Sequence, residues 1–183
     1  MTGFIILAIL VIAAVWTISI YNRLIKGKNL VNEGWSNIDV QLKQRANLIP
    51  NLVNTVKGYV THEKDLLTQI TQLRNQSLNA STVNEQGQAE NALTQTLGRL
   101  FAVAEDYPDL KANQQFLDVQ QQLSQLEEKI QMARRYYNGT VRSLNTLIES
   151  FPNNIVAGRF NFSKRDFFEL EDTNDRKVPK VEL

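Results

Sequence analysis

The chain has 183 residues, 43% of them hydrophobic, and a formal net charge of +1. This length favours one domain with its own core, and the near-neutral charge disfavours nucleic acid as a partner, because phosphate binding needs an excess of basic side chains. The absence of cysteine excludes disulfides, thiolate metal sites and thiol nucleophiles.

The N-terminal region, Phe4 to Ile20, is an uninterrupted apolar run, FIILAILVIAAVWTISI. Its length is at the short end for a membrane-spanning helix, and Trp16 and Tyr21 occupy positions typical of interfacial aromatics. A cleaved signal peptide is the alternative, but no basic segment precedes the run and no clear cleavage site follows it. We therefore expect residues 1–21 to form a transmembrane anchor through Phe4, Trp16, Ile20 and Tyr21.

The basic residues that flank this run lie on its C-terminal side, at Arg23, Lys26 and Lys28. Basic side chains favour the cytoplasmic face of a membrane. The sequence therefore predicts a single-pass protein with its N-terminus outside and its body in the cytoplasm.

Beyond the anchor, the periodicity is helical almost throughout. Two interleaved seven-residue series are largely apolar, which is typical of coiled-coil-like helices. They are Val31, Ile38, Arg45, Leu52, Tyr59, Leu66, Leu73 and Trp35, Leu42, Ile49, Val56, Glu63, Ile70, Ser77. With a similar pair of series from Ala112 to Phe151, the pattern predicts helices over about residues 22–76, 88–106 and 110–150.

The breaks in the pattern agree with this division. Residues 75–88 are polar and predict a loop, and Tyr107 is pushed out of the helical region by Pro108. We expect an all-α fold in which an antiparallel up-and-down helical bundle spans residues 22–151.

Pro50 lies inside the first predicted helix, within NLIPNLV. Proline removes a helical hydrogen bond, but the apolar series keeps its phase across this position. We therefore predict a bent, continuous helix with Pro50 away from the apolar seam.

After the bundle, residues 152–170 form an aromatic C-terminal segment that contains Phe160, Phe162, Phe167 and Phe168. A segment this apolar is not expected to be a free tail. It either folds back on its own bundle or docks between subunits. Residues 171–183 are charged and are predicted to be a flexible tail.

Several blocks of the sequence are similar to the signature blocks of one family. They are EGWSNIDVQLKQRANLIPNLVNTVKGYVTHEK, AEDYPDLKANQQF, ARRYYNGTVRSLN and SFPNNIVAGRFNF. On these blocks the chain resembles the LemA family of bacterial membrane proteins. The resemblance implies one N-terminal helix in the bacterial inner membrane, followed by an antiparallel helical bundle. It implies no reaction, and it links the family only in general terms to membrane proteases, envelope stress and membrane organelles.

The single histidine, His62, is followed by Glu63, and HEKDL begins like a zinc-protease helix. That motif needs a second histidine four residues later, where this chain has Leu66. We interpret His62 as a solvated or helix-edge residue; the alternative is a partner-binding patch or a weak pH-responsive contact. No metal ion and no cofactor are predicted.

Other catalytic patterns are missing from the sequence. The glycines are scattered instead of forming a phosphate-binding loop, and no serine sits between small residues in a nucleophile elbow. Neighbouring carboxylates such as Glu127 and Glu128 are interpreted as a solvated face. We expect no enzymatic activity, and no small-molecule substrate is evident.

Arg45 and Glu63 interrupt the apolar series. The simpler interpretation of Arg45 is a side chain at the seam's edge, with its methylenes on the core and its charge in water. The alternative is an ion pair with a carboxylate of a neighbouring helix or of a second chain.

The unequal lengths of the predicted helices leave an apolar seam without cover, which favours a homo-oligomer. The sequence thus predicts a non-catalytic, membrane-anchored scaffold or adaptor that assembles with itself. Its expected interaction residues are Asp39, Gln41, Lys43, Arg45, His62, Phe160, Phe162, Phe167 and Phe168. The alternative function is a regulatory or sensor subunit of a membrane protease or envelope-stress system, with a membrane protein as its partner.

Overall fold

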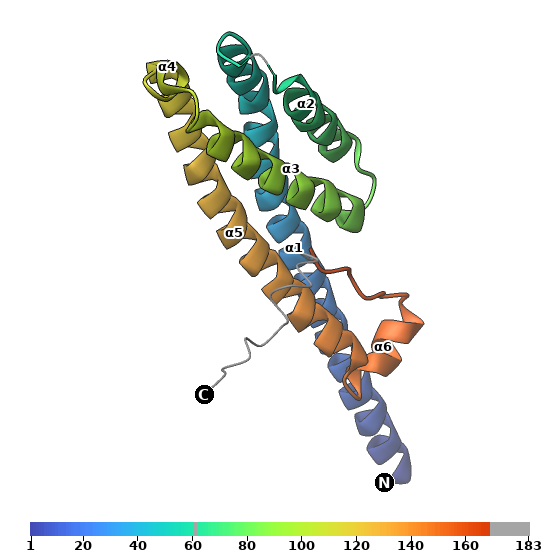
Figure 1. Cartoon of the computed structure of the whole chain (residues 1–183). Helices are drawn as coiled ribbons and strands as arrows, with labels where there is room; N and C mark the ends of the chain where they lie inside the picture. The colour runs from blue at the N-terminus through green and yellow to red at the C-terminus, as the bar shows by residue number, and fades with distance from the viewer. Residues whose placement is uncertain (61, 169–183) are drawn as a thin grey trace, which may run out of the picture. The chain divides into compact units, whose positions relative to one another are not determined.

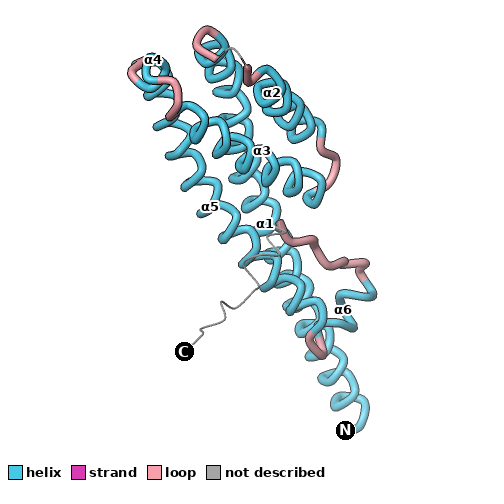
Figure 2. Tube along the Cα trace, viewed as in Figure 1, coloured by secondary structure: helices cyan, strands magenta, loops and turns pink. Residues whose placement is uncertain are grey.

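A computed structural model describes residues 1–60 and 62–168. Every regular element in that part of the chain is a helix, so the predicted all-α fold class is confirmed (Figures 1 and 2). The helices are α1 (Thr2–Lys57), α2 (Lys64–Asn79), α3 (Val83–Ala104), α4 (Pro108–Lys111), α5 (Gln114–Glu149) and α6 (Asn153–Arg159).

The described chain divides into two compact units. The first unit consists of Met1–Val40 and Lys129–Phe167, and the second consists of Gln41–Glu128 together with Phe168. Both α1 and α5 contribute a segment to each unit.

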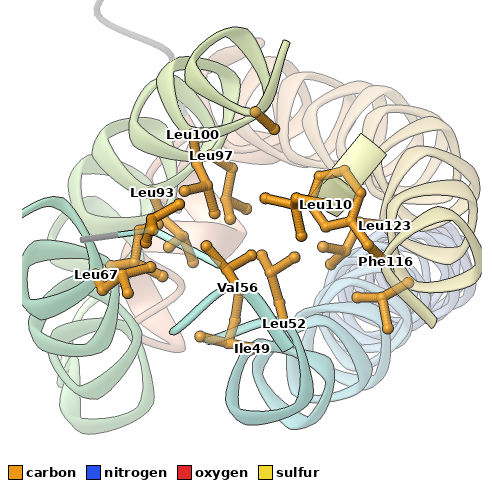
Figure 3. Packing of buried hydrophobic residues seen from close by; sticks show 14 residues of the cluster. Ile49, Leu52, Val56, Leu67, Leu93, Leu97, Leu100, Leu110, Phe116 and Leu123 are labelled. Carbon is orange, nitrogen blue, oxygen red and sulfur yellow. The ribbon is translucent and has the colours of Figure 1, made fainter. Parts of the chain in front are cut away.

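The second unit holds a hydrophobic cluster to which α1, α2, α3, α4 and α5 all contribute (Figure 3). Helix α2 packs along α3. The apolar series predicted from the sequence supplies one side of the cluster, because its members on α1 face inward at helical spacing. The labelled side chains are Ile49, Leu52, Val56, Leu67, Leu93, Leu97, Leu100, Leu110, Phe116 and Leu123.

The first unit is built on a close approach of α1 and α5. A Cβ atom added to Gly27 would lie 3.1 Å from Leu144 Cδ1, and one added to Gly34 would lie 3.2 Å from the Tyr137 Cα. Both glycines therefore allow the helices to approach. Since Gly34 follows Gly27 whereas Tyr137 precedes Leu144, these contacts run in opposite order along the two segments.

The aromatic C-terminal segment, as far as Phe167, belongs to the first unit and contacts α5 there. The side chain of Asn145 donates to the Arg165 carbonyl at 2.9 Å and accepts from the Arg165 amide at 2.8 Å. The Tyr137 hydroxyl donates to the Asp166 carbonyl at 2.9 Å. The described part of the segment therefore contacts its own chain. Docking between subunits stays a prediction. The tail predicted over residues 171–183 lies outside the described residues.

The single helix predicted over residues 22–76 is wrong. Helix α1 ends at Lys57 and α2 begins at Lys64, and the seam loses its phase where Tyr59 is exposed. Gly58 follows the last helical residue, and glycine costs about 0.5–1 kcal/mol in a helix interior. Helix α2 packs on α3, and Ile70 of α2 is completely buried in the hydrophobic cluster, which stabilises the reversal.

The loop predicted over residues 75–88 is also wrong for most of its length. Helix α2 continues to Asn79 and α3 begins at Val83. The Thr82 hydroxyl accepts from the Glu85 amide at 3.1 Å, while the Glu85 carboxylate accepts from the Thr82 amide at 3.2 Å. This reciprocal capping box is a sequence signature of a helix start, and it explains why α3 begins inside a polar stretch.

Pro50 lies inside α1, and its side chain is exposed. The helix is uninterrupted at this position. The bend expected there stays a prediction.

Candidate functional site

Arg45 is the centre of a buried ionic network in the second unit. Its side chain is 2% exposed. One guanidinium nitrogen, Nη2, forms an ion pair with Glu90, while Nη1 lies 2.6 Å from Glu127 Oε2 and donates to Thr94 Oγ1 at 2.9 Å. The Ser77 hydroxyl donates to the second carboxylate oxygen of Glu90. The network thereby joins α1 to α2, α3 and α5.

The network corrects two interpretations made from the sequence. Arg45 does not place its charge in water, because both it and Glu90 are almost fully buried. Glu127 is partly buried and paired, so it does not belong to a solvated face. Periodicity placed Arg45 on the seam, but it could not show that Glu90 and Glu127 come from two other helices to meet it.

The chemistry of the network is that of a structural ion pair that holds helices together. A guanidinium stays protonated and cannot act as a base, and both carboxylates are engaged with Arg45. An open cleft of about 310 Å³ is lined by Arg45, Glu127, Thr94 and Phe101, among others, but it holds no histidine. A buried pair with one geometry penalises alternative registers of the helices, since slippage would leave a charge buried without its partner.

His62 lies at the bend before α2 and is exposed. Its backbone N–H donates to Glu63 Oε2 at 3.1 Å, and the other Glu63 oxygen accepts from the Tyr107 hydroxyl at 2.8 Å. The hydrogen bond to Glu63 raises the pKa of Tyr107 above its ordinary value. Within residues 1–60 and 62–168, no three acidic or histidine side chains gather in a way that could hold a metal ion.

The interaction residues expected near Arg45 have different environments. Asp39 belongs to the first unit, and Gln41 and Lys43 to the second. Asp39 and Gln41 are half-buried, whereas Lys43 is exposed. Arg45 is almost fully buried, so it offers little exposed surface of its own. The role of these residues in an interaction stays a prediction.

Among the expected aromatic residues, the structure brings three together in the first unit. The Tyr21 ring packs edge-on against Phe160, with ring centroids 4.9 Å apart, and against Phe162 at 5.8 Å. Phe167 is half-buried, and Phe168 is completely buried. Tyr21, at the end of the apolar run, and the C-terminal segment are far apart in the sequence but thus form one aromatic cluster.

An open groove of about 540 Å³ runs between α1 and α5 in the first unit. Sequence periodicity did not indicate it, because a groove is defined by the distance between two helices. Its lining is mostly apolar and also includes small and basic residues. Leu30, Leu144 and Leu147 represent the apolar lining, Gly139 and Ser143 the small residues, and Arg23, Lys26 and Arg135 the basic ones.

The first part of α1 is exposed and apolar. Phe4 is 80% exposed and Trp16 is 50% exposed, whereas Ile20, where packing begins, is 6% exposed. Among the described helices, α1 has the length and apolar composition needed to cross a membrane. These features fit a membrane anchor. They do not fit the core helix of a water-soluble protein, because the apolar side chains of such a helix would be covered.

Residues 34–183 match the model of the LemA family. The chain belongs to the LemA family. The resemblance noted in the sequence blocks is thereby confirmed.

Named relatives of this LemA-family chain include Protein LemA of Metamycoplasma hominis, 27% identical over 164 residues, which cover 88% of this chain and 74% of that protein. Magnetosome protein MamQ 2 of Paramagnetospirillum magneticum is 22% identical over 174 residues, covering 81% of this chain and 64% of the relative. Magnetosome protein MamQ of Magnetospirillum gryphiswaldense is 22% identical over 169 residues, covering 78% and 62%. The chain spans less than two thirds of the length of these two magnetosome proteins.

The names of these relatives state no reaction. Together with the exposed apolar part of α1, they indicate a membrane-associated LemA-family protein.

Proposed function

We propose that this chain is a single-pass protein of the bacterial inner membrane that acts as a non-catalytic scaffold and assembles with itself. In this proposal residues 1–21 are the anchor, the N-terminus lies outside, and the helical body lies in the cytoplasm. Arg23, Lys26 and Lys28 support the orientation, because they follow the apolar run directly.

The observation that carries the scaffold proposal is the open groove of the first unit. It lies between α1 and α5, directly after the apolar run of the same helix. A Cβ atom at Gly139 would have no atom of another element within 4 Å, so a helix can approach the groove closely at this position. Contiguous exposed apolar surface is uncommon in monomeric proteins and marks sites of interaction.

A second copy is the proposed occupant of the groove. Copies anchored in one membrane share an orientation, and confinement to the membrane raises their effective concentration. Glu33 is exposed on α1, so an adjacent copy carries an acidic side chain that suits the basic groove residue Arg135.

Crosslinking in native membranes tests this proposal, since the chain contains no cysteine. We expect Gly139→Cys to give a crosslinked dimer with a short bifunctional thiol reagent. Gly98→Cys is the matched control, because it also replaces a helical glycine with open space around its Cβ but lies in the second unit. The protein mass of the detergent-solubilised particle, without its bound detergent, should exceed the mass of one chain.

A monomeric particle without Gly139→Cys crosslinks would contradict self-assembly. Crosslinks from Gly139→Cys to a membrane protease, without self-crosslinks, would support the regulatory-subunit alternative instead.

Labelling of Ser81→Cys tests the orientation, because Ser81 is exposed in the short connection between α2 and α3. We expect a membrane-impermeant thiol reagent to leave it unlabelled in intact cells and to label it after lysis. Labelling in intact cells would overturn the orientation.

A further inference from the structure

The α5–α6 turn and α6 expose an unusual amount of apolar surface. Phe151 is 79% exposed, Ile155 is 63% exposed and Phe160 is 49% exposed. The opposite face of α6 is packed into the first unit, since Val156 is 5% exposed and Ala157 is 1% exposed. Helix α6 is therefore held in place by one apolar face while it presents another outward.

The register between α1 and α5 sets the height of this surface along the anchor helix. From Gly27 to Gly34 and from Leu144 back to Tyr137, both helices advance by seven residues. Continued toward the apolar run, the same register brings the last turn of α5, which ends at Glu149, level with the end of that run at about Tyr21.

Ring contacts place the segment at the same height independently of that register. Phe160 and Phe162 both pack against Tyr21, the residue that ends the apolar run. Tyrosine at the end of a membrane helix is expected at headgroup level. The exposed side chains on either side of α6 therefore lie near the plane at which the anchor enters the membrane.

The charges around this surface suit an anionic bilayer. Arg23 and Lys26 are exposed on α1 just beyond the apolar run, and Arg159 is exposed at the end of α6. Basic side chains at this level attract anionic headgroups, while Phe and Ile side chains beside them insert into the acyl boundary.

We propose that the segment from Phe151 to Phe160 is a second membrane contact. It lies in the interfacial region of the leaflet at the Tyr21 end of the anchor. Phe151, Ile155 and Phe160 insert between lipids, and the nearby basic residues bind anionic headgroups. The proposal rests on the proposed membrane anchor, with which the surface is continuous through Tyr21. It gives the first unit a fixed face toward the membrane instead of free rotation about one helix.

Site-directed spin labelling of the full chain in vesicles tests the contact. We would introduce a single nitroxide-labelled cysteine at Phe151 or Ile155 and reconstitute the protein in phosphatidylethanolamine with phosphatidylglycerol. Collision rates with oxygen, which partitions into lipid, and with a water-soluble nickel chelate are then compared. Ile12, 68% exposed in the apolar run, is the lipid-exposed reference, and Met132, 55% exposed on α5 in the same unit, is the water-exposed control.

We expect the oxygen-to-nickel collision ratio at positions 151 and 155 to exceed that at 132 several-fold and to approach that at 12. The ratio at 155 should fall when phosphatidylcholine replaces both lipids. A ratio equal to that at 132 would overturn the second contact, and low collision with both reagents would overturn it in favour of a covering protein. If position 12 itself gave a water-like ratio, the anchor and the proposed function would fail; a lipid-like ratio at 12 with a water-like ratio at 155 removes only the second contact.

Discussion

The two units differ in how completely other elements cover the apolar seam of α1. In the second unit, the seam of α1 is covered by α2, α3, α4 and the start of α5, and even the charged Arg45 is enclosed there with its partners. In the first unit, α1 packs against α5 and the C-terminal segment, which leaves a groove and several exposed apolar side chains. The number of neighbouring elements, not the seam pattern, decides whether the apolar surface of a helix is buried in the fold or stays exposed.

The same contrast separates buried ionic contacts in the second unit from open apolar surface in the first. Burial of an ion pair adds little net stability, but it makes one arrangement of the surrounding helices far better than its alternatives. Open apolar surface costs stability in water unless lipid or protein covers it. We therefore expect substitutions in the second unit to act on folding, and many of those on the surface of the first unit to act on assembly.

The largest effect is expected at Arg45. Arg45→Met would leave the carboxylate of Glu90 buried without its cation, which costs about 3–5 kcal/mol. Urea unfolding of the detergent-solubilised chain, followed by far-UV circular dichroism, would measure the loss. In the double variant Arg45→Met with Glu90→Met, most of the stability should return, because an apolar pair replaces the ion pair. A loss under about 1 kcal/mol in the single variant would show that the pair behaves like an exposed one.

A smaller effect is expected where the first unit is closely packed. At Gly34 an added Cβ would meet backbone of α5 at 3.2 Å, so Gly34→Ala should destabilise the protein by about 1–3 kcal/mol. Gly98→Ala in α3 is the matched control, since it also lies inside a helix and no other element comes within 4 Å of its Cβ. It should stabilise the protein by about 0.5–1 kcal/mol, because alanine favours the helix. Equal thermal shifts in the two variants would contradict the close approach.

The start of α3 provides a third comparison within the second unit. Thr82→Ala removes the side chain that caps the helix and should cost about 1 kcal/mol. Thr68→Ala is the control, because the Thr68 hydroxyl bonds the Lys64 carbonyl inside α2 and caps no helix start. Hydrogen exchange of peptides from α3 should accelerate in Thr82→Ala but not in the control; unchanged exchange would argue against the capping box.

The smallest effect is expected at Tyr137. Tyr137→Phe removes the hydrogen bond to the Asp166 carbonyl, and because Asp166 is exposed, water can replace the donor, so the loss should be about 0.5 kcal/mol.

The pH dependence is the sharper test of this contact. Burial raises the pKa of Tyr137 above its ordinary value of 10.0, so the folded protein favours the neutral phenol. This contribution is complete below the pKa of the unfolded chain and is lost as the pH rises through the higher pKa of the folded protein. Unfolding of the wild type should therefore become easier above about pH 10, and the decline should be weaker in Tyr137→Phe. Parallel declines in both proteins would contradict the burial of this hydroxyl.

Much of the fold follows from local features of the sequence. The apolar run, the seven-residue series up to Val56 and the corner at Tyr107–Pro108 all act within a few residues of their own position. The reversal after Lys57 was missed because Gly58 is a weak signal, and the packing of α2 on α3 is what makes a reversal favourable there. The start of α3 could have been predicted from Thr82 and Glu85, whose spacing is that of a capping box.

The candidate sites were less accessible to sequence reasoning. The exception to the apolar series at Arg45 was visible, but its meaning depended on Glu90 and Glu127, which reach it from other helices. The groove and the cluster of Tyr21 with Phe160 likewise join residues far apart in the chain.

The sequence by itself determined the helical class, the apolar run of α1 and the family, because periodicity, composition and signature blocks are properties of neighbouring residues. Only the tertiary structure decided that the charge of Arg45 is buried, that the groove between α1 and α5 stays open, and that the aromatic segment returns to Tyr21. The physical reason is that burial depends on which elements meet. A side chain on a seam is enclosed or exposed according to how many other helices reach it, and no local pattern records that number.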